Sequence, residues 1–150
     1  LTEKIIDLLT LQNRSVPLLI SSSTQAALDN HYGMSKRLAE ECVFGYGREC
    51  GAPVFVYRLP NLFGKWCRPN YNSVVATFCH NIAHDLPIKV NDPDVVLNLT
   101  YIDDVVTSFV ETFEGRPVLK EEFAVVAPVH AIKLGSLVDL LYAFKNSRSD

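Results

Sequence analysis

The chain contains no glycine-rich turn of the kind that holds the phosphates of a dinucleotide. Its seven glycines are scattered, and no three of them fall in a G-x-G-x-x-G or G-x-x-G-x-x-G spacing. In dinucleotide-binding folds, that turn lets the backbone approach the pyrophosphate, and an acid about 20 residues later holds the ribose. The half of such a fold that grips the cofactor is therefore not expected among these residues.

Cysteine patterns typical of metal or redox sites are missing as well. The four cysteines, Cys42, Cys50, Cys67 and Cys79, show no C-x-x-C spacing. Zinc ligands and redox pairs usually come at such close spacing, so no metal site is predicted and a small redox or metal protein is disfavoured. Free thiols in a reducing cytoplasm are the expected state, because disulfides are rare there.

Charge and hydropathy argue against two further classes. The net charge of −3 indicates no nucleic-acid partner, since such a partner calls for a basic surface. No apolar run approaches the roughly 20 residues that span a membrane, and the first residues show no signal-peptide pattern. With 48% hydrophobic and 21% charged residues, the 150 residues suit one globular domain or part of one.

What is present is a succession of amphipathic and apolar segments that predicts an α/β fold. Helices are expected at residues 1–12, 30–50, 73–84, 103–113 and 134–145, and strands at residues 16–20, 54–59, 88–90, 95–100 and 123–126. The nearly uninterrupted apolar runs at 16–20 and 54–59 are typical of parallel strands buried on both faces. The predicted helix caps are Asp29 or Asn30, Ser73 and Asp103, with Gly51 as a helix stop.

A hydroxyl cluster and a tyrosine–lysine pair mark a candidate proton-transfer site. Residues 21–24, Ser-Ser-Ser-Thr, follow the first predicted strand, and the next helix carries Tyr32 and Lys36. A spacing of four residues puts the phenol and the ammonium on one helix face. Ligands of open α/β sheets bind at the carboxyl ends of the strands, where Ser23 and residues 60–61 are expected.

The pairing has a physical reason. A free tyrosine has a pKa of about 10, which makes it a poor acid or base at neutral pH. A positive charge about 4 Å away, at an effective dielectric near 20, favours the phenolate by about 4 kcal/mol. Lys36 is placed to supply that charge, and Ser23 to hydrogen-bond the reacting oxygen. A Y-x-x-x-K pattern alone also fits an ordinary solvated helix face; the serines upstream favour the catalytic interpretation.

A polar, aromatic loop at residues 65–72 is a second candidate site. It contains Trp66, Tyr71, Lys65 and Arg68. Because a guanidinium group matches phosphate oxygens, Arg68 is a candidate for holding a nucleotide diphosphate. The ordinary alternative is a surface loop with one packed tryptophan.

Several segments together resemble the extended short-chain dehydrogenase/reductase family, within the nucleotide-sugar epimerase/dehydratase superfamily. The segments are Leu-Leu-Ile-Ser-Ser-Ser-Thr at 18–24, Asn-His-Tyr-Gly-Met-Ser-Lys at 30–36 and Tyr-Arg-Leu-Pro-Asn-Leu-Phe-Gly at 57–64. The stretches at 63–81, 101–106 and 134–141 are similar to the members of this family that act as reductases in capsular polysaccharide synthesis. The resemblance covers nearly the whole chain.

The resemblance implies NADPH-dependent reduction of a UDP-linked 4-keto-6-deoxy-N-acetylhexosamine at C4, for a capsule precursor. The cofactor would be NADP(H), with NAD(H) as the other possibility. Tyr32 would protonate the ketone oxygen, Ser23 would hydrogen-bond that oxygen, and Lys36 would support Tyr32 and contact the nicotinamide ribose. The family usually has proline before the active tyrosine, whereas this chain has His31.

The same resemblance implies the remaining binding roles. Ser21 and the backbone of Leu59 and Pro60 would flank the nicotinamide. Asn61 and Arg68 would contact the UDP-sugar substrate.

The fold implied is the C-terminal half of a Rossmann-type parallel-sheet domain plus part of its sugar-nucleotide-binding subdomain. Residues 1–62 would belong to the Rossmann half, and residues 63–150 mostly to the substrate-binding subdomain. In the resembled reductases a glycine-motif half precedes these residues and a cupin domain follows, so activity of this fragment alone is not expected. Helices 1–12 and 30–50 would pack against a second subunit in a homodimer.

Two alternatives remain on the same residues. A 4,6-dehydratase of this superfamily carries an Asp-Glu pair just after the strand-end hydroxyl, whereas Ser23 is followed by Thr-Gln-Ala, so elimination is disfavoured. A nucleotide-sugar 4-epimerase stays open. The other alternative is a non-catalytic folding or dimerisation module.

Overall fold

The structure, a computed structural model, describes residues 1–12 and 15–147. The chain divides into two compact units. The first unit comprises Leu1–Pro60 and Ser108–Val126, and the second comprises Asn61–Thr107 and Ala127–Asp150. Helix α4, Ile102–Phe113, begins in the second unit and ends in the first.

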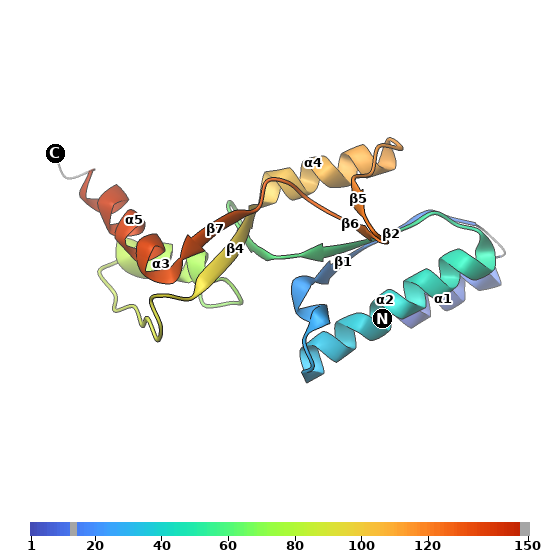
Figure 1. Cartoon of the computed structure of the whole chain (residues 1–150), viewed down its shortest axis with the longest axis horizontal. Helices are drawn as coiled ribbons and strands as arrows, with labels where there is room; N and C mark the ends of the chain where they lie inside the picture. The colour runs from blue at the N-terminus through green and yellow to red at the C-terminus, as the bar shows by residue number, and fades with distance from the viewer. Residues whose placement is uncertain (13–14, 148–150) are drawn as a thin grey trace. The chain divides into compact units, whose positions relative to one another are not determined.

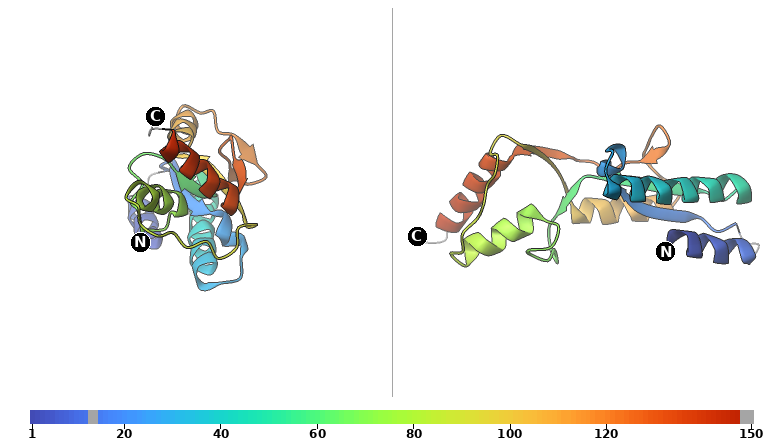
Figure 2. Two further views of the ribbon diagram at one scale, coloured as in Figure 1. Left: turned by 90° about the vertical axis from the view of Figure 1, so that its left-hand side faces the viewer. Right: turned by 90° about the horizontal axis from the view of Figure 1, so that it is seen from below.

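The first unit is a sheet with helices on both faces (Figure 1). Its strands are β1 (Leu18–Ser23), β2 (Val54–Leu59), β5 (Leu119–Lys120) and β6 (Phe123–Ala124), in the order β1-β2-β6-β5. Its helices are α1 (Thr2–Leu11), the short 3-10 helix η1 (Thr24–Ala27) and α2 (His31–Cys50). The pairs β1–β2 and β2–β6 are parallel, so the predicted α/β fold with a parallel sheet is confirmed. Helix α1 lies alongside α2 (Figures 1 and 2).

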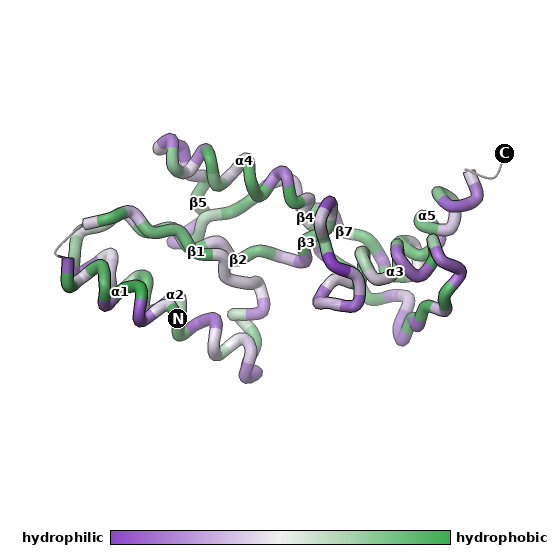
Figure 3. Tube along the Cα trace, turned by 180° about the vertical axis from the view of Figure 1, so that it is seen from behind, coloured by the Kyte–Doolittle hydropathy of each residue, from purple (hydrophilic) through white to green (hydrophobic). Residues whose placement is uncertain are grey.

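The core of this unit lies where β2 meets its covering helices. Val43, Tyr46, Val56 and Tyr57 are almost completely buried. The Tyr57 hydroxyl lies 2.6 Å from Thr112 Oγ1 of α4, on the opposite side of β2 from α2. Successive strand residues point to opposite faces, so Tyr57 packs against α4 and Arg58 points toward α2. Helices α1 and α4 alternate between hydrophobic and hydrophilic residues along their length (Figure 3).

Helix α2 begins and ends as predicted. Asn30 is its N-cap, and the side chain of Asn30 accepts a hydrogen bond from Gly33 N at 2.8 Å. Gly51 ends the helix in the left-handed conformation, with φ at 64°. Gly33 itself lies against η1, where a Cβ would come within 2.4 Å of the backbone oxygens of Gln25 and Leu28. The start of α2 is therefore packed tightly on the segment that follows β1.

The prediction for the first strand was wrong at both ends. The strand begins at Leu18, and it continues through the serines to Ser23. The register explains the extension, because Ser23 lies opposite Leu59 in the parallel pair with β2. Val16 lies outside the strand and exchanges two hydrogen bonds with the Tyr46 hydroxyl, each 3.0 Å long. The predicted strand at 123–126 is likewise shorter, ending at Ala124.

The second unit contains a smaller sheet and two helices. Its strands are β3 (Asn61–Phe63), β4 (Val96–Tyr101) and β7 (His130–Lys133), in the order β3-β4-β7, and its helices are α3 (Val74–Ala83) and α5 (Leu134–Asn146). Strand β4 is parallel to β3 and antiparallel to β7. Ser73 caps α3 as predicted, accepting a hydrogen bond from Ala76 N.

Two predictions for this unit were wrong, and two of its strands were not predicted. Residues 88–90 form no strand, because no other strand pairs with them. Asp103 does not cap α4 but lies within its first turn, where it forms an ion pair with Lys65. Strands β3 and β7 were not predicted, since three and four residues are too short to show a pattern. Among the described residues, no helix is long and apolar enough to cross a membrane.

Candidate active site

The hydroxyl cluster lies at the carboxyl end of β1. Ser23 is the last residue of the strand, and its Oγ accepts a hydrogen bond from Gln25 N at 3.2 Å, which caps η1. Ser21 is exposed, Ser22 is buried and Ser23 is half-buried. The sequence alone did not separate the three serines, and the structure does so by their burial.

Tyr32 and Lys36 lie in the first two turns of α2. Tyr32 is 50% exposed, so half of the residue's surface is open to solvent or to a ligand. The Lys36 Nζ atom lies 5.5 Å from the centre of the Tyr32 ring, within the range of a cation–π contact. The predicted spacing therefore does place the ammonium beside the phenol ring.

Leu59 and Pro60 lie at the carboxyl end of β2, next to Ser23. The register pairs Ser23 with Leu59, so both strands end at the same level. Leu59 is buried. Asn61 starts β3 and pairs with Leu99, so it belongs to the second unit together with Arg68. The structure thus places Ser21, Ser23, Tyr32, Lys36, Leu59 and Pro60 in one unit, and Asn61 and Arg68 in the other.

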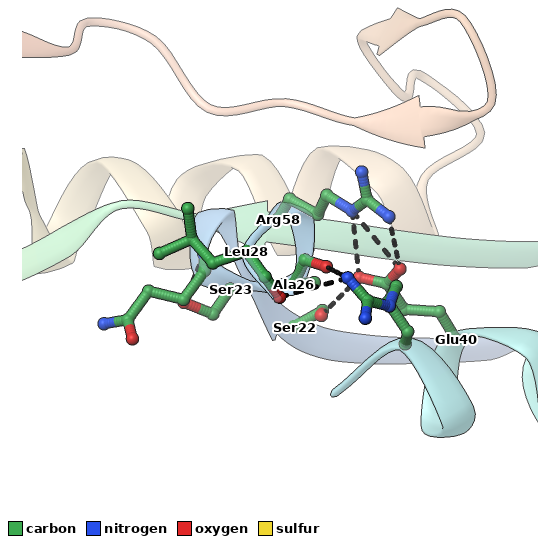
Figure 4. Close-up of polar contacts among 8 residues, drawn as sticks. Ser22, Ser23, Ala26, Leu28, Glu40 and Arg58 are labelled. Carbon is green, nitrogen blue, oxygen red and sulfur yellow. Dashed lines mark hydrogen bonds and ion pairs between the residues drawn. The ribbon is translucent and has the colours of Figure 1, made fainter. Parts of the chain in front are cut away.

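A polar cluster that sequence reasoning missed joins α2 to strands β1 and β2 of the first unit (Figure 4). Glu40 of α2 is only 3% exposed. Its carboxylate accepts a hydrogen bond of 2.5 Å from Ser22 Oγ and one of 2.6 Å from Arg58 Nη2. Arg58 Nε donates to both oxygens of the same carboxylate, at 3.0 and 3.2 Å. The hydrogen bond to Glu40 raises the pKa of Arg58 above its ordinary value, against the effect of burial.

Two signals pointed to this cluster. Glu40 follows Lys36 by four residues, which places it on the same helix face. Arg58 is a charge within an apolar strand, and a charge buried in such a place needs a partner. What the sequence does not contain is the strand register, which brings Ser22 and Arg58 opposite each other.

A second arginine fastens η1 to α2. Arg37 Nη1 donates to the backbone oxygens of Ala26 and Leu28, at 3.0 and 3.1 Å. Its other terminal nitrogen lies 3.6 Å from the Asp29 carboxylate. The chain between the strand-end serine and the helix with Tyr32 is therefore held by an arginine of the helix itself.

The loop at residues 64–72 is built differently. Trp66 is 96% exposed, so the predicted alternative of a packed tryptophan is wrong. Trp66, Asn70 and Asn72 all have positive φ angles, 67°, 57° and 53°, which side-chain-bearing residues seldom adopt. The Arg68 guanidinium lies 6.0 Å from the Tyr71 ring centre.

Charge on this loop is partly neutralised. Lys65 Nζ lies 2.8 Å from an oxygen of Asp103, and this hydrogen bond raises the pKa of Lys65. Two hollows adjoin the loop. One of about 330 Å³ is lined by Leu62, Phe63, Lys65, Trp66, Cys67 and Ile102, and another of about 460 Å³ shares Phe63, Lys65 and Cys67 and extends to α3. Across the described residues, no group of three or more His, Cys, Asp or Glu side chains gathers as for a metal ion.

Comparison with known proteins adds to this geometry. The sequence profile described as the NAD dependent epimerase/dehydratase family matches residues 14–120. A UDP-2-acetamido-2,6-beta-L-arabino-hexul-4-ose reductase from Pseudomonas aeruginosa is 48% identical over 149 residues, which are 99% of this chain and 40% of the reductase. The capsular polysaccharide assembling protein CapF from Staphylococcus aureus is 47% identical and superposes with a TM-score of 0.92, over 98% of this chain and 41% of CapF.

More distant structures share the fold alone. A UDP-glucose 4-epimerase from Thermotoga maritima is 18% identical, with a TM-score of 0.78 over 95% of this chain and 51% of the epimerase. A dTDP-glucose 4,6-dehydratase from Bacillus anthracis is 16% identical, with a TM-score of 0.81. The chain spans about two fifths of the length of the reductase and of CapF.

Proposed function

The chain belongs to the NAD dependent epimerase/dehydratase family, and we propose that it forms the proton-transfer part of a nucleotide-sugar reductase. The proposed substrate is a UDP-linked 4-keto-6-deoxy-N-acetylhexosamine, reduced at C4 in the synthesis of a capsular polysaccharide precursor. The names of the two relatives that are nearly half identical to this chain support this choice. One observation carries the proposal. Tyr32 is half-exposed and has the Lys36 ammonium 5.5 Å from its ring centre, on a helix that is hydrogen-bonded to the strand ending in Ser23.

Tyr32 is the proposed general acid. Reduction of a ketone leaves charge on its oxygen, which a proton must neutralise. Tyr32 is exposed enough to meet a ligand, and Lys36 holds a positive charge beside it, which stabilises the phenolate left after the proton has gone. Restoring the proton from solvent completes the cycle.

Ser23 is the proposed donor to the ketone oxygen. Its Oγ already accepts a hydrogen bond from Gln25 N, which orients the hydroxyl group. A hydroxyl has one donor and two acceptor sites. Within the described part of the chain the Ser23 hydroxyl donates to no protein group, so it can donate a hydrogen bond to the ketone oxygen of the substrate.

The residues present fit the nicotinamide end of a cofactor. NADPH supplies the hydride in this chemistry, and NADH could do the same. Ser21, two residues before the end of β1, and the backbone of Leu59 and Pro60, at the carboxyl end of the neighbouring parallel strand β2, would hold it. Lys36 would contact its ribose. The scattered glycines leave the pyrophosphate without its usual turn among these residues.

Asn61 and Arg68 are the proposed contacts to the UDP-sugar. Both are polar residues of the second unit, and the arginine can bind two phosphate oxygens at once.

A second copy of the chain is the proposed partner. The helices α1 and α2 expose large apolar side chains that such a partner would cover: Leu8, Leu11, Met34 and Leu38.

The experiment is made on the full-length protein with NADPH and the UDP-linked 4-keto sugar. Tyr32→Phe removes only the phenol hydroxyl, so turnover should fall by about 10²–10⁴-fold with an unchanged melting temperature. Tyr142→Phe makes the same change at a partly exposed tyrosine of α5 and should keep full turnover. Full turnover in Tyr32→Phe would remove this residue as the acid. Interconversion of two UDP-sugars without net use of NADPH would instead identify an epimerase.

A further inference from the structure

The most unusual feature outside the proposed catalytic residues is the Glu40 clamp, formed by Ser22, Glu40 and Arg58. We propose that Glu40 is a positioning residue: through this clamp it holds the helix face with Tyr32 and Lys36 in register with the strand end at Ser23. The inference rests on the proposed function, since it concerns the same site.

The clamp connects three elements at one point. Glu40 belongs to α2, Ser22 to β1 and Arg58 to β2, and Figure 4 shows the three side chains converging. Ser22 and Arg58 are opposite each other in the parallel register. Each is followed by a residue of the proposed site, Ser23 in β1 and Leu59 in β2. A shift of Glu40 would therefore displace the residues at both strand ends, Ser23 and Leu59.

On the helix, the clamp residue Glu40 lies on the face that carries Tyr32 and Lys36. Glu40 lies four residues after Lys36 and eight after Tyr32, so the three side chains lie on one face of α2 over two turns. The clamp thus fixes both the rotation of the helix about its axis and its position along the strand. Those two variables decide where the phenol and the ammonium lie relative to the Ser23 hydroxyl.

The guanidinium of Arg58 is held on a second side as well. Its central carbon lies 3.8 Å from the centre of the Phe123 ring in β6. Phe123 in turn packs edge-on against Phe44 of α2, with ring centres 5.8 Å apart. Phe44 lies one turn after Glu40, so Arg58 is connected to α2 both directly through Glu40 and indirectly through Phe123 and Phe44. The arginine has little freedom to carry Glu40 to another position.

A stabilising role alone does not explain a polar clamp here. Burying an ion pair costs so much solvation that well-packed apolar residues often give equal or greater stability. What apolar residues lack is direction, because a carboxylate with several hydrogen bonds has one orientation and a methyl contact has many. The clamp is therefore suited to fix geometry, and displacements of about 1 Å at an active site can cost 10²-fold in rate.

The test separates geometry from stability, in the full-length protein with NADPH and the UDP-linked 4-keto sugar. The double variant Glu40→Met/Arg58→Met replaces the ion pair by apolar side chains of similar length. It should melt near the wild-type temperature, while kcat falls by about 10–100-fold and KM changes little. Ser22→Ala removes one hydrogen bond to the clamp and should lower kcat by a smaller factor. Glu41→Gln is the matched control, on the exposed neighbour of Glu40, and should change neither quantity.

A second readout does not depend on turnover. Amide hydrogen exchange over residues 21–36 should be faster in the double variant than in the wild type and in Glu41→Gln, while exchange in the core of β2 stays slow. Wild-type kcat together with unchanged exchange in a folded double variant would overturn the positioning role. So would a loss of kcat that merely follows the fraction of unfolded protein.

Failure of the proposed function gives a different pattern. In that case the wild-type protein would not reduce the keto sugar, or Tyr32→Phe would reduce it as well as the wild type. Faster exchange over residues 21–36 would then still support the clamp as the device that positions this helix face, and unchanged exchange would overturn it.

Discussion

The two compact units hold their candidate residues in opposite ways. In the first unit, the proposed catalytic residues lie on a strand end and on a capped helix, and an ion pair between a buried carboxylate and a half-buried arginine joins the same elements. In the second, Arg68 lies on an irregular loop with an exposed tryptophan and three non-glycine residues at positive φ. The first arrangement limits motion, whereas the second leaves side chains free to adapt.

The difference matches the two tasks in the proposed function. Proton transfer needs atoms held to a fraction of an ångström, which regular elements and buried hydrogen bonds provide. Recognition of a flexible nucleotide sugar tolerates, and often uses, adaptable loops on a rigid frame. Four predictions test this contrast.

Truncating a buried aromatic should strongly destabilise the first unit, whereas truncating the exposed tryptophan should leave the stability of the second almost unchanged. Tyr57 is fully buried and Trp66 is 96% exposed. We expect Tyr57→Ala to lower the free energy of unfolding by about 3–5 kcal/mol. Trp66→Ala should change it by less than about 0.5 kcal/mol and should raise KM for the UDP-sugar several-fold. Denaturant unfolding and steady-state kinetics of the full-length protein measure both. A large loss of stability in Trp66→Ala would mean that the tryptophan is packed after all.

Breaking one side of the ion pair should cost more than removing both sides. Arg58→Met leaves the carboxylate of Glu40 buried without its cation, and the side chain of Glu40 is only 4% exposed. We expect a loss of about 3 kcal/mol, because removing one partner of a buried pair is strongly destabilising. Arg48→Met is the control, because Arg48 is an exposed arginine of α2, the helix that carries Glu40. Equal stability of Arg58→Met and the wild type would show that the pair is open to water.

Gly64 should be the least tolerant position of the loop in the second unit. Its φ angle is 127°, and a Cβ there would come within 2.6 Å of the Tyr101 ring. We expect Gly64→Ala to lower the free energy of unfolding by about 1–3 kcal/mol, chiefly because the added Cβ must displace the Tyr101 ring. Gly115→Ala provides the comparison, since Gly115 also has positive φ but has open space around it. If both variants lost the same stability, backbone strain rather than the ring contact would be the cause.

The Lys65–Asp103 pair should have the smallest effect, and one that depends on pH. The pKa of Lys65 is raised in the folded chain by its hydrogen bond to Asp103. Its stabilisation is therefore fully present below the ordinary pKa of 10.5 and is lost as the pH rises through the raised value. Lys65→Met should melt slightly below the wild type at neutral pH, and the two should converge in strong alkali. Lys133→Met removes another exposed pair and is the control. A difference that persists in alkali would contradict the ionic origin.

Much of the first unit was predictable because its signals are local. Asn30 before an amphipathic stretch and Gly51 after it define α2, and the apolar run at 54–59 defines β2. The four-residue spacing of Tyr32 and Lys36 follows from helix geometry alone. Elements of three or four residues, such as β3 and β7, carry no comparable pattern, because they form only when a partner strand is present.

The α/β class, the capped helix, and the tyrosine and lysine on its face follow from the amino-acid order, since each depends on residues close together in the chain. The tertiary structure alone decided that β1 runs on to Ser23, that Ser22 rather than its neighbours is buried, and that Glu40 meets Arg58. Those outcomes depend on the register of two strands and on the packing of a helix across them. Such contacts join residues 18 positions apart in the chain, and no local propensity encodes them.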